Sequence, residues 1–138
     1  MFNKIKQFAM SLDSDKNIRE WGRSITLRSD ISDINLLVCN YREKFLILNP
    51  KSSIILETHS KYNEVWIADN EFDYLLEDEN KQIVKHRSEK FERVFIPKGY
   101  KHKLINPNDV NLNIFEIQTG QIKDDDKIQY KEEDICLI

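Results

Sequence analysis

Short runs of apolar, β-branched and aromatic residues recur along most of this chain, and polar turn residues separate them. Such runs are typical of strands, and many short strands at regular spacing predict a sandwich or barrel. The expected strands are residues 24–27, 35–38, 45–48, 54–59, 64–68, 72–76, 82–84, 93–96, 102–105 and 112–117. The pattern therefore predicts an all-β jelly roll.

The two ends of the chain break this pattern. Residues 2–12 space their large apolar side chains three or four positions apart, which predicts a short amphipathic helix. Residues 123–133 are dense in Asp, Glu and Lys, and we expect a solvated terminal segment or a last helix there. With 138 residues, the chain has room for one domain with a core. We expect an N-terminal helix and arm over residues 1–18 and a single domain over residues 19–138.

Composition limits the class of protein. Charged residues make up 33% of the chain and apolar residues 40%, which is typical of a globular protein. The formal net charge is −3 and no basic face stands out, so no nucleic-acid partner is expected. No apolar run approaches the roughly 18 residues that span a membrane, and the first residues contain no signal-peptide pattern. Cys39 and Cys136 fit no zinc motif, so we expect free thiols in a cytoplasmic protein without membrane association.

The clearest chemical signal is the run Pro97-Lys98-Gly99-Tyr100-Lys101-His102, which follows an apolar run at residues 94–96. Pro-x-Gly predicts a tight turn out of one strand, and His102 lies at the start of the next strand. Imidazole is the commonest protein ligand for metals. His102 is therefore the first candidate ligand, whereas His86 lies in a polar stretch and is expected in an exposed loop.

A second candidate cluster lies upstream, at Glu57, His59 and Glu64. Alternate residues of a strand share a face, so Glu57 and His59 point the same way, and Glu64 opens the next strand. Taken singly, such a histidine is more often a hydrogen-bonded core residue, and such a glutamate is more often solvated. The joint arrangement with His102 favours a metal, because two inward-facing carboxylates need a positive partner. We predict that these four residues hold one divalent ion, and Zn, Mn, Fe, Ni and Co all suit nitrogen and oxygen ligands.

Both clusters resemble the two sequence motifs of the cupin superfamily. The second motif, Pro-x-Gly-x-x-His-x-x-x-Asn, is complete in residues 97–106. The first motif runs Gly, five residues, His-x-His, three or four residues, Glu, six residues, Gly. Its spacing is kept here, but Lys51, Glu57 and Glu71 replace the first Gly, the first His and the last Gly. The resemblance implies a cupin-type double-stranded β-helix.

A closer resemblance is to the cupin domain of type II mannose-6-phosphate isomerases, which is often fused to mannose-1-phosphate guanylyltransferase. That family's Arg-Pro-Trp-Gly is similar to residues 19–22. Its metal strand, Ser-Leu-Gln-x-His-His-His-Arg-x-Glu-His-Trp, is similar to residues 55–66. Its closing Ile-Glu-Val-Gln-x-Gly and the Asp-Asp pair after it are similar to residues 114–120 and to Asp125-Asp126. The resemblance covers nearly all of residues 19–132.

Several positions depart from that family. Glu57 stands in place of a glutamine, and either side chain offers an oxygen ligand, so this replacement is compatible with a metal site. Ser60 and Lys61 replace the second and third histidines of the metal strand. Gln129 stands in place of an arginine that is a candidate phosphate or catalytic contact. The resemblance therefore implies the barrel and the metal more strongly than the mannose 6-phosphate substrate.

The activity that the resemblance implies is aldose–ketose isomerisation of a phosphorylated sugar in surface-polysaccharide precursor metabolism. A metal would polarise the carbonyl, and a carboxylate or a water would move a proton between C1 and C2 through a cis-enediol. Glu116, which shares a strand face with Gln118, is the candidate base. Lys61 and Lys101 are expected near the barrel mouth, where they would attract the phosphate, although each is more often simply a solvated lysine.

Other functions stay open. Loss of the two histidines and of the late arginine also suits a non-catalytic sugar-binding or assembly module on a cupin barrel. A cupin reaction on a nucleotide-activated sugar would need a different histidine pair, of which the sequence shows no clear sign. Cupins often dimerise through sheet faces, and Ile54 and Leu56, expected to face outward, offer apolar surface for a homodimer. Burial beneath the N-terminal segment would explain these two residues equally well.

Overall fold

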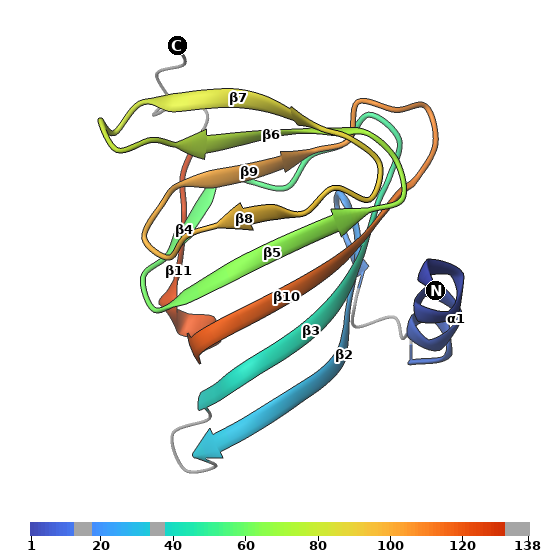
Figure 1. The fold of residues 1–138 in the computed structure, drawn as a ribbon, viewed down its shortest axis with the longest axis horizontal. Coiled ribbons are helices and arrows are strands. Elements are labelled where there is room, and N and C mark those ends of the chain that lie inside the picture. Colours follow the sequence, from blue (N-terminus) through green and yellow to red (C-terminus); the bar gives the residue numbers. More distant parts are fainter. Residues whose placement is uncertain (13–17, 34–37, 132–138) are drawn as a thin grey trace.

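The structure, a computed structural model, describes residues 1–12, 18–33 and 38–131. One N-terminal α-helix is followed by strands that form two antiparallel sheets (Figure 1). The first sheet contains, in spatial order, β1 (Ile18–Arg19), β2 (Gly22–Asp33), β3 (Val38–Leu48), β10 (Leu112–Ile122), β5 (Tyr62–Ala68) and β8 (Val94–Ile96). The second contains β11 (Lys127–Gln129), β4 (Glu57–His59), β9 (His102–Ile105), β6 (Phe72–Glu77) and β7 (Ile83–Ser88). The predicted all-β architecture with a short N-terminal helix is confirmed.

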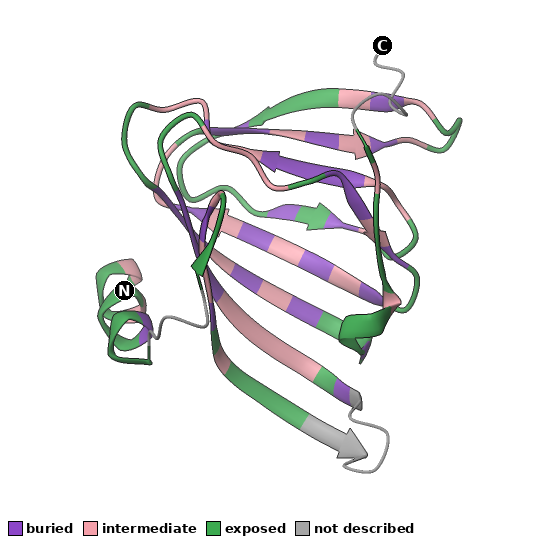
Figure 2. Cartoon of the chain, turned by 180° about the vertical axis from the view of Figure 1, so that it is seen from behind, coloured by how far each residue is buried: buried purple, intermediate pink, exposed green. Residues whose placement is uncertain are grey.

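Alternation along the strands produces the core between the sheets. On β5, Tyr62, Glu64, Trp66 and Ala68 are buried, whereas the residues between them are partly exposed. Figure 2 shows this alternation as purple and pink bands along the central strands of the first sheet. The main core cluster consists of Leu46, Leu48, Trp66, Ala68, Phe72, Val94, Ile96, Leu104, Leu112 and Ile114. Both sheets therefore bury one face against each other.

Helix α1 (Phe2–Leu12) packs against the outer face of the first sheet. Ala9 is fully buried against side chains of β2 and β3, and Phe2 and Ile5 pack against the same cluster. The predicted amphipathic helix is confirmed, but Phe8 and Leu12 stay largely exposed because Ala9 occupies the face that meets the sheet. No helix within the described residues is long and apolar enough to cross a membrane.

Long-range pairing accounts for most differences from the predicted strands. Residues 38–48 form one strand, β3, because β2 and β10 pair with it along nearly its whole length. Residues 35–37 of the predicted strand 35–38 lie outside the described part of the chain. The predicted strand 54–59 is shorter in the structure, where β4 comprises only its last three residues. The loop prediction for His86 is wrong, because this exposed residue lies on β7.

The acidic C-terminal segment is largely exposed, which agrees with the first of the two alternatives expected for it, a solvated segment; its described residues contain no α-helix. Asp124–Asp126 form a 3-10 helix, and β11 then pairs with β4. Tyr130 donates its backbone N–H to the carbonyl of Leu56 (2.8 Å) and packs against the cluster around Leu56. Leu56 belongs to a cluster separate from the core between the sheets, so its predicted outward orientation holds, but it is buried, and the segment that covers it is C-terminal rather than N-terminal. Ile54 is partly buried and packs against the main core.

Candidate metal centre

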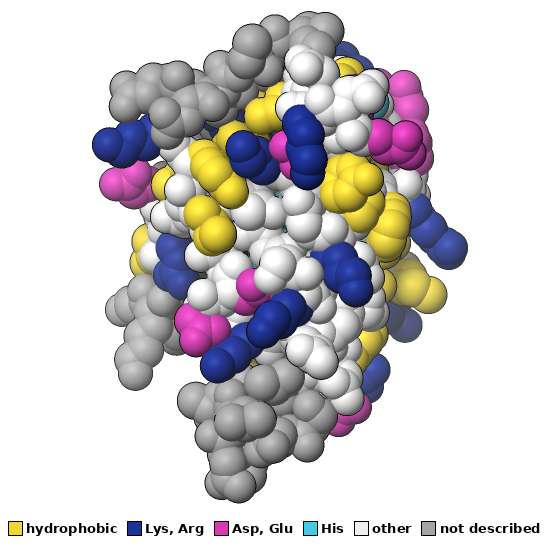
Figure 3. Space-filling view, turned by 90° about the vertical axis from the view of Figure 1, so that its left-hand side faces the viewer, with side chains coloured by type: hydrophobic (Ala, Val, Ile, Leu, Met, Phe, Trp, Pro, Cys, Tyr) yellow, Lys and Arg dark blue, Asp and Glu magenta, His cyan; other side chains and the backbone are white. Residues whose placement is uncertain are grey.

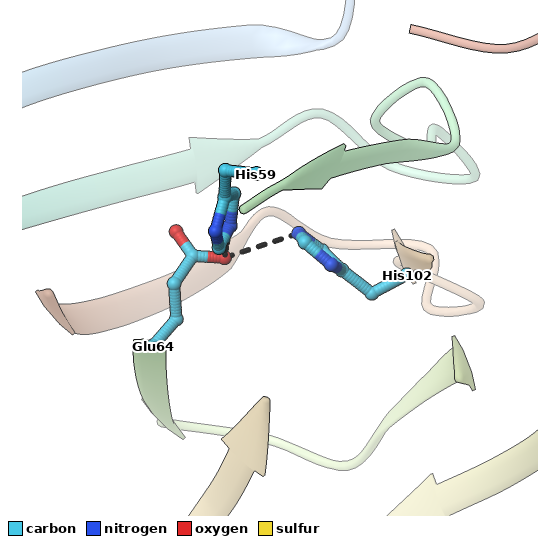
Figure 4. Close-up of side chains that lie close together, drawn as sticks. All are labelled: His59, Glu64 and His102. Atoms are coloured by element: carbon cyan, nitrogen blue, oxygen red, sulfur yellow. Dashed lines mark ion pairs between the residues drawn. The ribbon is translucent and has the colours of Figure 1, made fainter. Parts of the chain in front are cut away.

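Three of the predicted ligands converge between the sheets (Figure 4). His59 ends β4, Glu64 lies on β5 and His102 begins β9. The Oε1 atom of Glu64 is 3.1 Å from Nε2 of His59 and 3.1 Å from Nε2 of His102. All three side chains are buried. Two consecutive strands and a third, β9, that is distant from them in sequence thus bring two nitrogens and one oxygen to a single point.

Backbone carbonyls set the orientation of both imidazole rings. Nδ1 of His59 lies 2.8 Å from the carbonyl of Tyr62, and Nδ1 of His102 lies 2.9 Å from the carbonyl of Tyr100. A carbonyl only accepts, so each Nδ1 donates its proton, and a ring in its neutral form then turns an Nε2 lone pair toward Glu64. The two Nε2 atoms and Oε1 of Glu64 are buried without a hydrogen-bond partner among the described residues. Three convergent acceptors of this kind fit a divalent cation.

The pKa values of this cluster reflect the same convergence. Burial would raise the pKa of Glu64, but protonated His102 and His59 rings would donate to this carboxylate, and this interaction holds its pKa well below its usual value. Burial would lower the pKa of His102, but the hydrogen bond to Glu64 and its charge raise it. The site therefore favours an ionised carboxylate facing positive charge, which a metal or imidazolium protons can supply.

Glu57, the fourth predicted ligand, lies at the margin of this cluster. Its Oε1 is 3.9 Å from Nε2 of His102, and its Oε2 is 3.7 Å from Nζ of Lys127 on β11. Burial raises the pKa of Glu57, and the charge of Lys127 opposes that rise. The structure thus brings three of the four predicted ligands together and places Glu57 between them and a lysine.

Glu116, the predicted base, points into the barrel next to the cluster. Its Oε1 accepts a hydrogen bond from Nε1 of Trp66 (3.0 Å), and its Oε2 accepts one from Nε2 of Gln118 (3.1 Å). Burial and the charge of Glu64 raise the pKa of Glu116 well above its usual value. Two neighbouring carboxyl groups therefore have pKa values shifted in opposite directions, which is typical of acid–base sites.

Gln118 connects these two carboxyl groups, a role that the sequence did not predict. Its Nε2 also donates to Oε2 of Glu64 (2.8 Å), and its Oε1 accepts from Nε of Arg42 (2.7 Å). Because the guanidinium can only donate, Arg42 fixes which end of the amide faces the carboxylates. Strand alternation placed Gln118 on the same face as Glu116, but nothing local indicated that Arg42 would meet it.

A cavity of about 130 Å³ lies beside the cluster and is lined by Glu57, Glu64 and Glu116. Basic residues also line it, from three different segments: Arg19, Lys44 and Lys127. Figure 3 shows this end of the barrel from outside, where Lys and Arg side chains stand beside acidic ones. Burial lowers the pKa of Lys44, while the charge of Glu116 opposes that shift. None of these basic residues was predicted from the sequence to take part in the site. Lys44 and Lys127 reach it through strand pairing, and Arg19 was noted only as part of the Arg-x-Trp-Gly resemblance.

The two lysines predicted to bind phosphate lie elsewhere. Lys61 is exposed in the turn between β4 and β5, and its backbone N–H donates to Asp126. The ammonium of Lys101 lies 4.5 Å from the ring centroid of Tyr130. Neither lysine is among the described residues that line the cavity.

The two predicted cupin motifs are joined by their backbones. The N–H of Gly99 donates to the carbonyl of His59 (2.7 Å), so the turn before His102 holds the strand end that carries the other histidine. Gly99 has φ +81°, a conformation that favours glycine. Asn106, the last residue of the second motif, donates to the carbonyls of Asn49 and Val110 and is therefore structural.

Residues 14–133 match the protein family described as Mannose-6-phosphate isomerase C-terminal. The chain belongs to this family. Mannose-1-phosphate guanylyltransferase 2 of Escherichia coli O157:H7 is 30% identical over 94 residues, which are 67% of this chain and 18% of that protein. The chain thus spans less than a fifth of this relative's length. The resemblance predicted from the sequence is confirmed.

Solved structures share the fold at low sequence identity. The capsular polysaccharide assembling protein CapF from Staphylococcus aureus has 17% identity and a TM-score of 0.68 over 83% of this chain and 31% of its own. Oxalate decarboxylase from Lactobacillus farciminis has 15% identity and a TM-score of 0.64 over 80% of this chain and 32% of its own. Protein SO0799 from Shewanella oneidensis has 9% identity and a TM-score of 0.73 over 96% and 85%. These similarities confirm the cupin fold.

Proposed function

We propose that this protein is a metal-dependent isomerase that interconverts an aldose phosphate and a ketose phosphate. The observation that carries the proposal is the convergence of three buried acceptor atoms, from His59, Glu64 and His102, beside a cavity lined by further carboxyl groups. Membership of the Mannose-6-phosphate isomerase C-terminal family supports this substrate class.

The reaction moves one proton between C1 and C2 of the sugar and another between their oxygens. A divalent ion held by His59, Glu64 and His102 would act as a Lewis acid toward the carbonyl oxygen. Glu116 would move the carbon-bound proton, because burial raises its pKa and such shuttles work best with pKa values near the working pH. Trp66 and Gln118 would hold its carboxyl group in place.

The basic residues of the cavity suit an anionic substrate. Lys127 lies next to Glu57, Lys44 lies near Glu116, and Arg19 lines the same cavity. We expect the phosphate to contact these residues rather than Lys61 or Lys101, because charge acts most strongly where the site excludes water.

Metal analysis and an isomerase assay test the proposal together. We expect a divalent metal to co-purify, and mannose 6-phosphate and fructose 6-phosphate to interconvert until a chelator stops the reaction. Adding the metal back should restore activity. A protein that binds metal but changes neither sugar would instead be a sugar-binding module or act on another sugar, and a protein without metal affinity would contradict the metal centre.

A further inference from the structure

We propose that residues 124–130, here called the C-terminal strap, position the metal centre, and that strap docking and metal binding favour each other. This inference rests on the proposed metal site but not on the sugar chemistry. Figure 1 shows the strap beside β4, at the end of the barrel where β5 begins. Three strap residues, Asp124, Asp126 and Lys127, contact the site or the residues that support it.

Asp126 holds the turn that directly follows His59. Its Oδ2 accepts the backbone N–H groups of Ser60 (3.0 Å) and Lys61 (2.9 Å). Its Oδ1 accepts the hydroxyl of Ser60 (2.6 Å). Three hydrogen bonds to one carboxylate thus fix the backbone next to a metal ligand. Asp125, in the same 3-10 helix, makes only an exposed ion pair with Lys123 (3.4 Å) among the interactions found in the described residues.

Asp124 reaches the site through Arg42. Its Oδ1 is 3.0 Å from a terminal guanidinium nitrogen of Arg42, whose Nε donates to Gln118. Gln118 in turn donates to Glu64. A continuous chain of polar contacts therefore connects the strap to the carboxylate that faces both histidines.

Strand β4 depends on the strap for most of its pairing. Its three residues all pair with β11, whereas only Glu57 pairs with β9 on the other side, opposite His102. Lys127 of the strap also lies 3.7 Å from Glu57. Because β4 carries both Glu57 and His59, an undocked strap would loosen two metal-site residues at once. By linkage, whatever factor the docked strap adds to metal affinity, bound metal adds to strap docking.

Cobalt(II) is a suitable probe, because its visible absorption reports the geometry of its ligands. We would compare Asp126→Ala with Asp125→Ala, a matched loss of one carboxylate from the same turn. We expect Asp126→Ala to bind Co²⁺ about 10- to 100-fold more weakly, with an altered absorption spectrum, and Asp125→Ala to stay within about twofold of wild type. Bound Co²⁺ should also slow amide exchange in β11 of wild type, and less so in Asp126→Ala.

A milder variant keeps the test valid if Asp126→Ala does not fold. Ser60→Ala removes only the hydroxyl contact to Asp126, so it should weaken Co²⁺ binding in the same direction but less. Equal Co²⁺ affinity and spectra for the Asp126, Ser60 and Asp125 variants, with wild type binding Co²⁺, would overturn the inference and leave the proposed function standing. A wild-type protein that binds no Co²⁺ would overturn the inference together with the metal centre itself.

Discussion

The two ends of the barrel interior differ sharply, although the same strands build both. Toward one end, β10 and β5 pair Ile114 with Ala68 in the main core. Toward the other, the same strands pair Gln118 with Glu64 beside the two histidines. Trp66 lies between the two ends, with its ring in the core and its Nε1 hydrogen-bonded to a buried carboxyl group.

One end of the barrel interior therefore mainly stabilises the fold, and the other end carries the groups that can bind a metal or a substrate. The apolar end stabilises the fold by burying surface, and it holds the strands rigidly enough to place side chains at the other end. The polar end buries several charged groups, and each costs free energy unless it finds a partner. Three acceptor atoms there have no hydrogen-bond partner among the described residues, which is the arrangement expected of a binding site rather than of a core.

The largest effect on stability should come from the apolar end. Ile114→Ala should lower the free energy of unfolding by about 2–5 kcal/mol, because it leaves a cavity in the packed core. Ile117→Ala, on the partly exposed face of the same strand, should cost clearly less. Urea unfolding of both variants measures the two values, and equal losses would contradict the division described above.

At the polar end, a substitution should affect metal binding more than stability. Glu64→Gln should weaken metal binding by more than about 100-fold, because it removes the only carboxylate within the described part of the chain that faces both histidines. Its metal-free protein should lose less stability than Ile114→Ala, since the amide keeps the shape of the side chain. Calorimetric titration with metal and urea unfolding measure both effects. The exposed Glu89→Gln variant is the control and should behave as wild type.

Among the lysines, only those lining the cavity should affect the KM for the substrate. Lys44→Met should raise the KM for a sugar phosphate about 10-fold, the loss expected for one charged contact. Lys61→Met and Lys101→Met should change the KM by less than about twofold, because both residues lie away from the cavity lining. The opposite ranking would restore the phosphate role predicted from the sequence.

The pH dependence should be the smallest effect, at most about 1.4 kcal/mol per pH unit for one proton. In metal-free protein the pKa of His102 is raised above 6.5, so above that pH the folded state holds more protons than the unfolded state. Stability should therefore fall as pH rises through the folded-state pKa. With Zn²⁺ the stability should instead rise with pH, because imidazoles must lose their protons before they bind the metal. Urea midpoints from pH 6 to 9, with EDTA or Zn²⁺, measure both trends, and parallel curves would contradict the metal centre.

The candidate ligands were predictable because their signals are local. His59 lies two positions after Glu57, and His102 follows a Pro-x-Gly turn, so spacing alone placed them on strands with a defined inward face. The partners of these residues were not predictable in the same way. Arg42 reaches Gln118 across 76 positions of sequence, and only the pairing of β3 with β10 brings them together.

By itself, the sequence predicted the all-β architecture, the inward face of most strands and four candidate ligands, three of which converge, because alternation and turn chemistry act over a few residues. Only the tertiary structure decided that the acidic C-terminal segment pairs with β4, that it buries Leu56, and that Lys44 and Lys127 line the cavity. Each of these outcomes depends on which strands become neighbours. That choice is made by the packing of the whole chain, and no short stretch of sequence contains it.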